Sequence, residues 1–97
     1  MTQSEKNHEM ICYTIFRTTS NLEKSFEFID KLPFSAELKD SFKDAEVGMA
    51  RVNFQFAKEM FNISYPELNA DQALDISAKL SNAELIINSF ENTTTHE

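Results

Sequence analysis

The residues in this sequence that could do acid–base, nucleophilic or metal chemistry are two histidines and one cysteine. His8 and His96 lie near the two ends of the chain, in polar segments that we expect to be disordered. A general base or a metal ligand needs a fixed position, so we interpret both histidines as solvent-exposed bystanders. Cys12 then has no histidine on a rigid element to activate it, and we interpret it as a small buried apolar side chain.

Carboxylate pairs at helical spacing are the remaining candidates for chemistry. Glu23 and Glu27 lie one helical turn apart, as do Asp40 and Asp44, but neither pair falls on an apolar stripe. We interpret both pairs as parts of solvated helix faces. The single glycine cannot build a phosphate-binding loop, and no short metal-binding motif occurs. We therefore predict no catalytic, cofactor-binding or metal-binding residues, no cofactor and no enzyme activity.

The elements that would position any site are predicted to be long helices. The chain has 97 residues, 41% of them apolar, with nine Phe, one Gly and two Pro. So few turn-forming residues argue against a β architecture. We expect one helical domain over residues 1–97, in which residues 1–8 and 92–97 are disordered tails.

The central stretch, residues 35–63, is predicted to be one helix with apolar residues on two opposite faces. The first series has steps of four and three residues until its last step of seven, and consists of Leu38, Phe42, Ala45, Met49, Val52, Phe56 and Ile63. Such spacing is typical of the seam along which one helix packs on another. At about 100° per residue, a second series points roughly the opposite way. Its members are Val47, Phe54 and Phe61, with Ala50 and Ala57 beside them.

Residues 69–91 form a second clear helix, opened by a capping box of Asn69 and Gln72. The short turn before it predicts an antiparallel neighbour of the central helix, covering the Leu38–Ile63 series. Residues 10–19 favour either a strand or a helix. We predict a helix that runs to about Lys31, with a helix start or a kink at Ser20; as a strand, the segment would need a pairing strand from a second copy. The fold class is all-α: a small bundle of three to four helices built on a long antiparallel helix pair.

The second face of the central helix is the candidate interaction surface. Exposing Val47, Phe54 and Phe61 would cost roughly 1.5–3 kcal/mol each, so we expect this face to be covered. Either the N-terminal segment covers it as core, or a partner does. We predict an interaction face of five residues: Val47, Ala50, Phe54, Ala57 and Phe61.

The charge and the targeting features of the sequence limit the classes of partner and the cellular compartment that we expect. The formal net charge is −7, and from Glu59 onward the chain carries seven acids and one base. We expect no nucleic-acid partner, because binding phosphates needs a basic patch. An amphipathic helix on a lipid surface would also want a basic polar face, so we expect no membrane binding. A single cysteine and a polar N-terminus without a signal sequence predict a cytoplasmic protein.

Two resemblances concern the C-terminal half. Lys79-Leu80-Ser81, followed by Leu85, Asn88, Asn92 and Thr93, resembles a helix of type III secretion needle subunits. Residues 53–84 are similar to the end of phasins, which are granule-coating helical proteins. Each likeness covers about a third of the chain and rests on helix–turn–helix patterning. Both imply a helical hairpin, and neither carries functional residues to this chain.

Taken together, the patterns predict a small non-enzymatic protein–protein interaction module acting through an apolar helix face. An adaptor, a chaperone, an antitoxin or immunity protein and a regulatory subunit all fit this description. The partner would be another protein or a second copy of the chain, forming a homodimer. The alternatives are a carrier of an apolar ligand in a Phe-lined cavity and a helical structural or secretion-related subunit.

Overall fold

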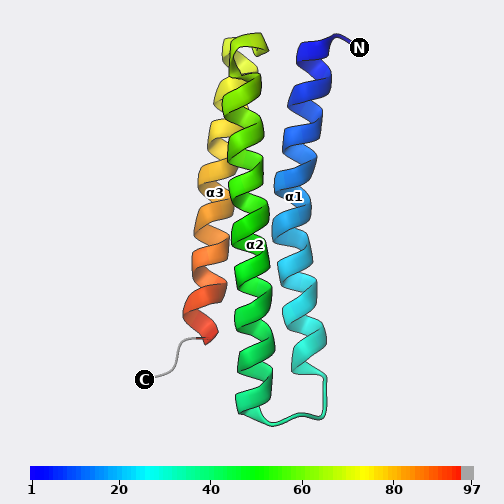
Figure 1. Cartoon of the computed structure of the whole chain (residues 1–97), viewed down its shortest axis with the longest axis vertical. Helices are drawn as coiled ribbons and strands as arrows, with labels where there is room; N and C mark the ends of the chain where they lie inside the picture. The colour runs from blue at the N-terminus through cyan, green and yellow to red at the C-terminus, as the bar shows by residue number, and fades with distance from the viewer. Residues whose placement is uncertain (95–97) are drawn as a thin grey trace.

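The chain folds into three long α-helices placed side by side, as the computed structural model shows for residues 1–94 (Figure 1). Helix α1 spans Gln3–Asp30, α2 spans Ala36–Ser64 and α3 spans Ala70–Thr94, with a short 3-10 helix, η1, at Tyr65–Glu67. Successive helices run in opposite directions, so α2 and α3 form the expected antiparallel pair and α1 runs parallel to α3. The described part of the chain contains no strand, which confirms the all-α prediction.

Helix α1 starts earlier than expected and has no break at Ser20. It begins with a capping box in which the Thr2 hydroxyl accepts a hydrogen bond from the backbone N–H of Glu5 (3.1 Å) and the Glu5 carboxylate accepts one from the backbone N–H of Thr2 (2.8 Å). Two of the N–H groups that every helix start leaves unpaired are thus satisfied. The helix then continues through Ser20 without a new start.

This cap corrects one expectation about the N-terminal half, because residues 3–8 are helical rather than a disordered tail. The prediction of a helix over residues 10–19 is confirmed, and the alternative of a strand is wrong. At the other end, residues 92–94 are the last residues of α3, and the rest of the predicted tail, residues 95–97, lies outside the described residues.

The two turns between helices follow the sequence signals. Ser35 caps α2 by accepting a hydrogen bond from the Leu38 backbone N–H (3.2 Å), two residues after Pro33. Asn69 and Gln72 form the predicted capping box of α3: each side-chain oxygen accepts a hydrogen bond from the other residue's backbone N–H, at 2.8 and 3.0 Å. Both turns are short, so each helix lies against the one that precedes it.

The hydrophobic core runs the length of the bundle between the three helices. Its buried side chains are Ile11, Ile15, Leu22 and Phe26 from α1, Val47, Ala50, Phe54 and Ala57 from α2, and Ile76, Leu80, Ala83 and Ile87 from α3. Near one end, the rings of Phe26 and Phe90 meet edge to face, with centroids 4.7 Å apart. Within residues 1–94, no helix is both long and apolar enough to cross a membrane.

The structure buries one of the two apolar faces of α2 and leaves the other exposed, whereas the sequence predicted that both are covered. The face of Val47 and Phe54 is buried against both α1 and α3, whereas the Leu38–Ile63 series points into solvent. The expectation that the last helix covers the Leu38–Ile63 series is therefore wrong. Ala50 and Ala57 supply the physical reason, because two small side chains on one face let two neighbouring helices approach the α2 backbone closely.

Two phenylalanines two residues apart provide a direct test of this assignment. Phe54 is 9% exposed and Phe56 is 59% exposed. We expect Phe54→Ala to lower the free energy of unfolding by about 3–5 kcal/mol, the usual loss for a buried phenylalanine. Phe56→Ala, the matched control, should change the unfolding free energy of the monomer by less than about 1 kcal/mol. Urea denaturation followed by circular dichroism at low protein concentration measures both, and equal losses would contradict the assignment.

Candidate functional site

A polar network joins the first three turns of α1 to η1 and α3. Ser4 donates a hydrogen bond to the Gln72 side chain, and Asn7 Nδ2 donates one to Glu67 Oε1 at 2.8 Å. One turn further along α1, His8 Nε2 lies 2.7 Å from Asp75 Oδ2. Ser4, His8 and Cys12 are spaced four residues apart, which places them on one face of α1. Because α1 and α3 run parallel, that face meets polar residues of α3 in the same order.

Asp75 is the centre of this network. It contacts His8, Cys12 and Lys79, and we call these four residues the Asp75 cluster. The Lys79 ammonium donates hydrogen bonds to both oxygens of the Asp75 carboxylate, at 2.6 and 2.7 Å. The Cys12 thiol donates a weaker one, with 3.6 Å between Sγ and Oδ2. The hydrogen bonds from Lys79 and then from His8 lower the pKa of Asp75 from 3.8 to about 2. The same contact with Asp75 raises the pKa of Lys79.

The chemistry open to Cys12 follows from what surrounds its sulfur. Burial raises the pKa of the thiol, and the nearby Asp75 carboxylate acts in the same direction, against the attraction of Lys79. The thiolate is the nucleophilic form of cysteine, so a raised pKa keeps the reactive form scarce at neutral pH. The partners of the two groups also matter, because the thiol and His8 both form hydrogen bonds with Asp75 Oδ2 rather than with each other. A cysteine–histidine nucleophile would need the imidazole on the sulfur instead.

The Asp75 cluster also has the donor types of a metal site. A nitrogen of His8, Sγ of Cys12 and a carboxylate oxygen of Asp75 all lie within 4.8 Å of one another, and zinc accepts all three donor types. Lys79, however, occupies both oxygens of the carboxylate that would have to bind the ion. A cation here would displace one ammonium contact and sit beside the same charge. The geometry therefore favours a network that ties α1 to α3.

Sequence reasoning missed this cluster because it placed His8 in a disordered tail. Two signals could have found it: the Thr2-to-Glu5 capping box, which starts the helix before His8, and the one-turn spacing of His8 and Cys12. The arrival of Asp75 from the third helix has no local signal. It depends on how α1 and α3 pack.

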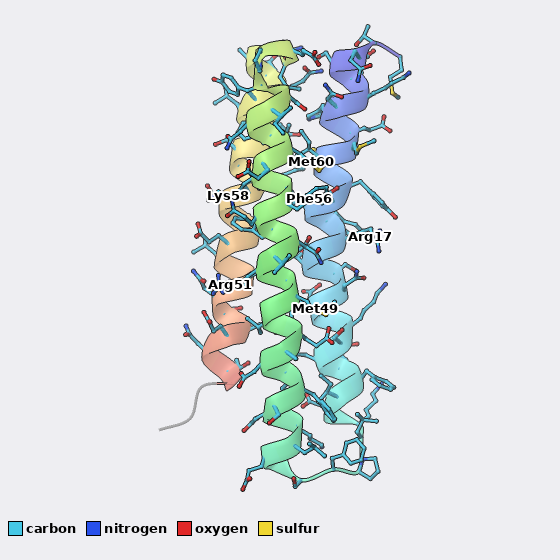
Figure 2. The ribbon with its side chains drawn as sticks, viewed as in Figure 1. Arg17, Met49, Arg51, Phe56, Lys58 and Met60 are labelled. Atoms are coloured by element: carbon cyan, nitrogen blue, oxygen red, sulfur yellow. The ribbon has the colours of Figure 1, made fainter. Side chains whose placement is uncertain are left out.

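The second candidate is an exposed apolar surface along α2, which we call the outer face. It consists of the seven apolar residues of the first series: Leu38, Phe42, Ala45, Met49, Val52, Phe56 and Ile63. Its six large members are between 39% and 77% exposed. Seen along this face, Met49, Phe56 and Met60 lie on the side of α2 towards α1, and Arg51 and Lys58 lie on the side towards α3 (Figure 2).

The borders of the outer face are held by contacts to both neighbouring helices. On the α3 side, Arg51 donates hydrogen bonds to Asn88, at 2.8 Å, and to Glu91. On the α1 side, Tyr13 and Arg17 line a shallow groove with Asn53 and Phe56, and the Arg17 guanidinium lies 5.8 Å from the centre of the Tyr13 ring. The outer face is thus a strip about 40 Å long, with polar edges and an apolar centre.

The predicted interaction face has a different location. Val47, Ala50, Phe54 and Ala57 are buried in the core, and Phe61 is half-buried and packs against it. The sequence left open whether this face is covered by the same chain or by a partner. In the structure, these side chains pack against α1 and α3 of the same chain. In this fold the four buried side chains offer no surface to a partner, and Phe61 is partly exposed at the edge of the core.

Comparisons of the chain with protein-family models, with curated proteins and with solved structures find no match.

The Asp75 cluster predicts a specific dependence of stability on pH. Because the pKa of Asp75 is lowered in the folded protein, its ionised form stabilises the fold above pH 3.8, and this contribution is lost as the pH falls to about 2. Asp75→Asn should thus be less stable than the wild type at pH 7, and the difference should shrink between pH 4 and pH 2. Urea denaturation across that range measures it. Asp44→Asn, at an exposed position of α2, is the control, and a loss for Asp75→Asn that does not change with pH would contradict the prediction.

Proposed function

We propose that this protein is a small non-enzymatic protein–protein interaction module whose working surface is the outer face of α2. The single observation that carries the proposal is the exposure of six large apolar side chains at helix-seam spacing, in a series interrupted at Glu59. Scattered exposed apolar residues are ordinary on protein surfaces, but contiguous apolar patches beyond a few hundred Å² mark interaction sites. Leaving six such side chains in water costs free energy that a partner would recover.

The pattern of the outer face also says what kind of partner suits it. Steps of three and four residues present a seam to a second helix, whose side chains enter the gaps between those of α2. A partner helix with a matching apolar stripe therefore suits the face better than a flat or strongly charged surface does. We expect that partner to be another protein or a second copy of this chain.

The Asp75 cluster supports the non-enzymatic part of the proposal. Its carboxylate is paired with Lys79 and His8, and its thiol has a raised pKa. These groups hold one another and link α1 to α3. A stable three-helix support is what an interaction surface on α2 requires, because the outer face works only if α2 is held straight.

A carrier of an apolar ligand is the alternative, favoured by one observation. Phe28, Phe34 and Phe42 line an aromatic depression of about 340 Å³ where α1 turns into α2. The depression is open to solvent, since these three rings are 39–65% exposed, and it adjoins the end of the outer face. Organic extraction of the purified protein followed by mass spectrometry tests this function. We expect no lipid in stoichiometric amount, and finding one would favour the carrier over the interaction module.

A matched pair of variants tests the interaction surface. Val52 lies on the outer face and is 69% exposed, whereas Leu85 on α3 is 68% exposed and lies off that face. We expect the wild type at high micromolar concentration to show a mass above 11.2 kDa by light scattering. Val52→Glu should return the protein to 11.2 kDa with its helicity intact, because a buried unpaired charge is costly.

Leu85→Glu is the control and should behave as the wild type. A wild-type protein that stays monomeric at high micromolar concentration would rule out self-association. The outer face would then need a different protein as its occupant.

A further inference from the structure

The geometry points to a second copy of this chain as the occupant of the outer face, lying antiparallel to α2 across a two-fold axis near residues 50 and 51. This inference rests on the proposed function and specifies its partner and geometry. A two-fold interface brings the same surface of both copies together, so that residue i meets residue j and residue j meets residue i. The outer face has a pattern of that kind.

The spacing of the outer face reads the same in both directions. With Glu59 included, which occupies the one seam position without an apolar residue, the steps from Leu38 to Ile63 are four, three, four, three, four, three and four. Turning a second copy around therefore brings every seam position opposite another seam position. The resulting pairs are Leu38 with Ile63, Phe42 with Glu59, Ala45 with Phe56 and Met49 with Val52, each formed twice.

Side-chain size favours this antiparallel arrangement over a parallel one. Antiparallel pairing places the bulky Phe56 against the small Ala45 of the other copy, and it pairs side chains of middle size in the Leu38–Ile63 and Met49–Val52 layers. Parallel pairing would set Phe56 against Phe56 and Ala45 against Ala45. Interfaces pack to the density of protein interiors, and alternation of large and small side chains is how neighbouring layers fill without gaps.

Charge favours the same arrangement. In a parallel pair, Glu59 of one copy would face Glu59 of the other inside the seam, and opposed like charges are destabilising. In the antiparallel pair, Glu59 faces Phe42, and Lys39 of the other copy lies one turn from that position. Lys39 lies at the border between the two apolar faces of α2, where its ammonium donates a hydrogen bond to the Asp30 carbonyl oxygen at 2.9 Å. The one acid on the seam thus avoids the same acid of the other copy in the antiparallel pair.

Gly48 fits a closely approaching second copy. A glycine inside a helix is unfavourable relative to alanine, and a Cβ added at Gly48 would meet no atom of its own chain within 4 Å. Packing within the bundle therefore does not require the glycine. Gly48 is exposed beside Met49, near the middle of the seam. In the antiparallel pair it flanks the central layer of Met49 and Val52, where a missing Cβ lets the second copy approach closely.

The exposed apolar area approaches what a dimer interface buries. An aromatic side chain offers roughly 150–250 Å², and an aliphatic one offers less. At exposures of 39–77%, the six large members of the outer face offer on the order of 600 Å². The polar borders, including the groove beside Tyr13 and Arg17, add to this, which brings the total near the roughly 800 Å² per partner of a standard interface.

Cysteine cross-linking at the two ends of the outer face tests the direction of pairing. Leu38→Cys and Ile63→Cys are made separately in a Cys12→Ser background, with a size tag on one of them. Both positions are exposed, at 41% and 77%, and the centre of the seam stays intact. In the antiparallel dimer, position 38 lies beside position 63 of the other copy, whereas like positions lie about 38 Å apart, 25 residues at 1.5 Å each.

The samples are oxidised after subunit exchange, and light scattering on the same samples reports their mass. We expect cross-linked dimers only in the mixture of the two variants, and none in either variant alone. Cross-linking of each variant with itself would show parallel pairing and overturn the inference. A dimer by light scattering that cross-links in neither case would overturn the antiparallel register while leaving the proposed function in place. A monomer throughout would overturn the inference and remove a second copy as the occupant.

Discussion

In a bundle where three helices pack on one another around a common core, each helix buries one side, and this constraint governs the molecule. Helix α2 carries apolar side chains on two opposite faces, and α1 and α3 both pack on the face that contains Val47 and Phe54. The alanines of that face allow close approach from two directions, which the larger side chains of the outer face do not. The exposed apolar surface follows from this packing, because the face of α2 that neither helix covers is largely apolar.

Side-chain contacts between α1 and α3 hold the third side of the bundle together. These two helices are not joined by a turn, so their alignment depends on side chains alone. The core supplies most of the attraction, and the polar network from Ser4 to Lys79 adds contacts at the end where α1 begins. Hydrogen bonds between charged groups are directional, so such a network helps to select one register of α1 against α3. Its donor atoms are of the types found in reactive or metal sites, but Lys79 already forms an ion pair with the Asp75 carboxylate and neutralises its charge.

The sequence allowed the secondary structure to be predicted well wherever local chemistry decides it. The caps at Ser35 and at Asn69 with Gln72 lie where the sequence places them, because a cap depends only on residues a turn apart. The same kind of signal at Thr2 and Glu5 was present but outweighed by the polar composition of the first eight residues. The β-branched residues of positions 10–19 became helical because the stripe of Ile11 and Ile15 finds a core to pack on.

The sequence by itself determined that the chain is helical, where two of its three helices begin, and that its middle helix has two apolar faces. Only the tertiary structure decided which face is core and which is surface, because both faces satisfy helical periodicity equally well and burial depends on neighbours far along the chain. The meeting of His8 and Cys12 with Asp75 has the same origin. Residues one turn apart can be recognised from spacing, but a contact across 63 positions exists only once the helices have packed.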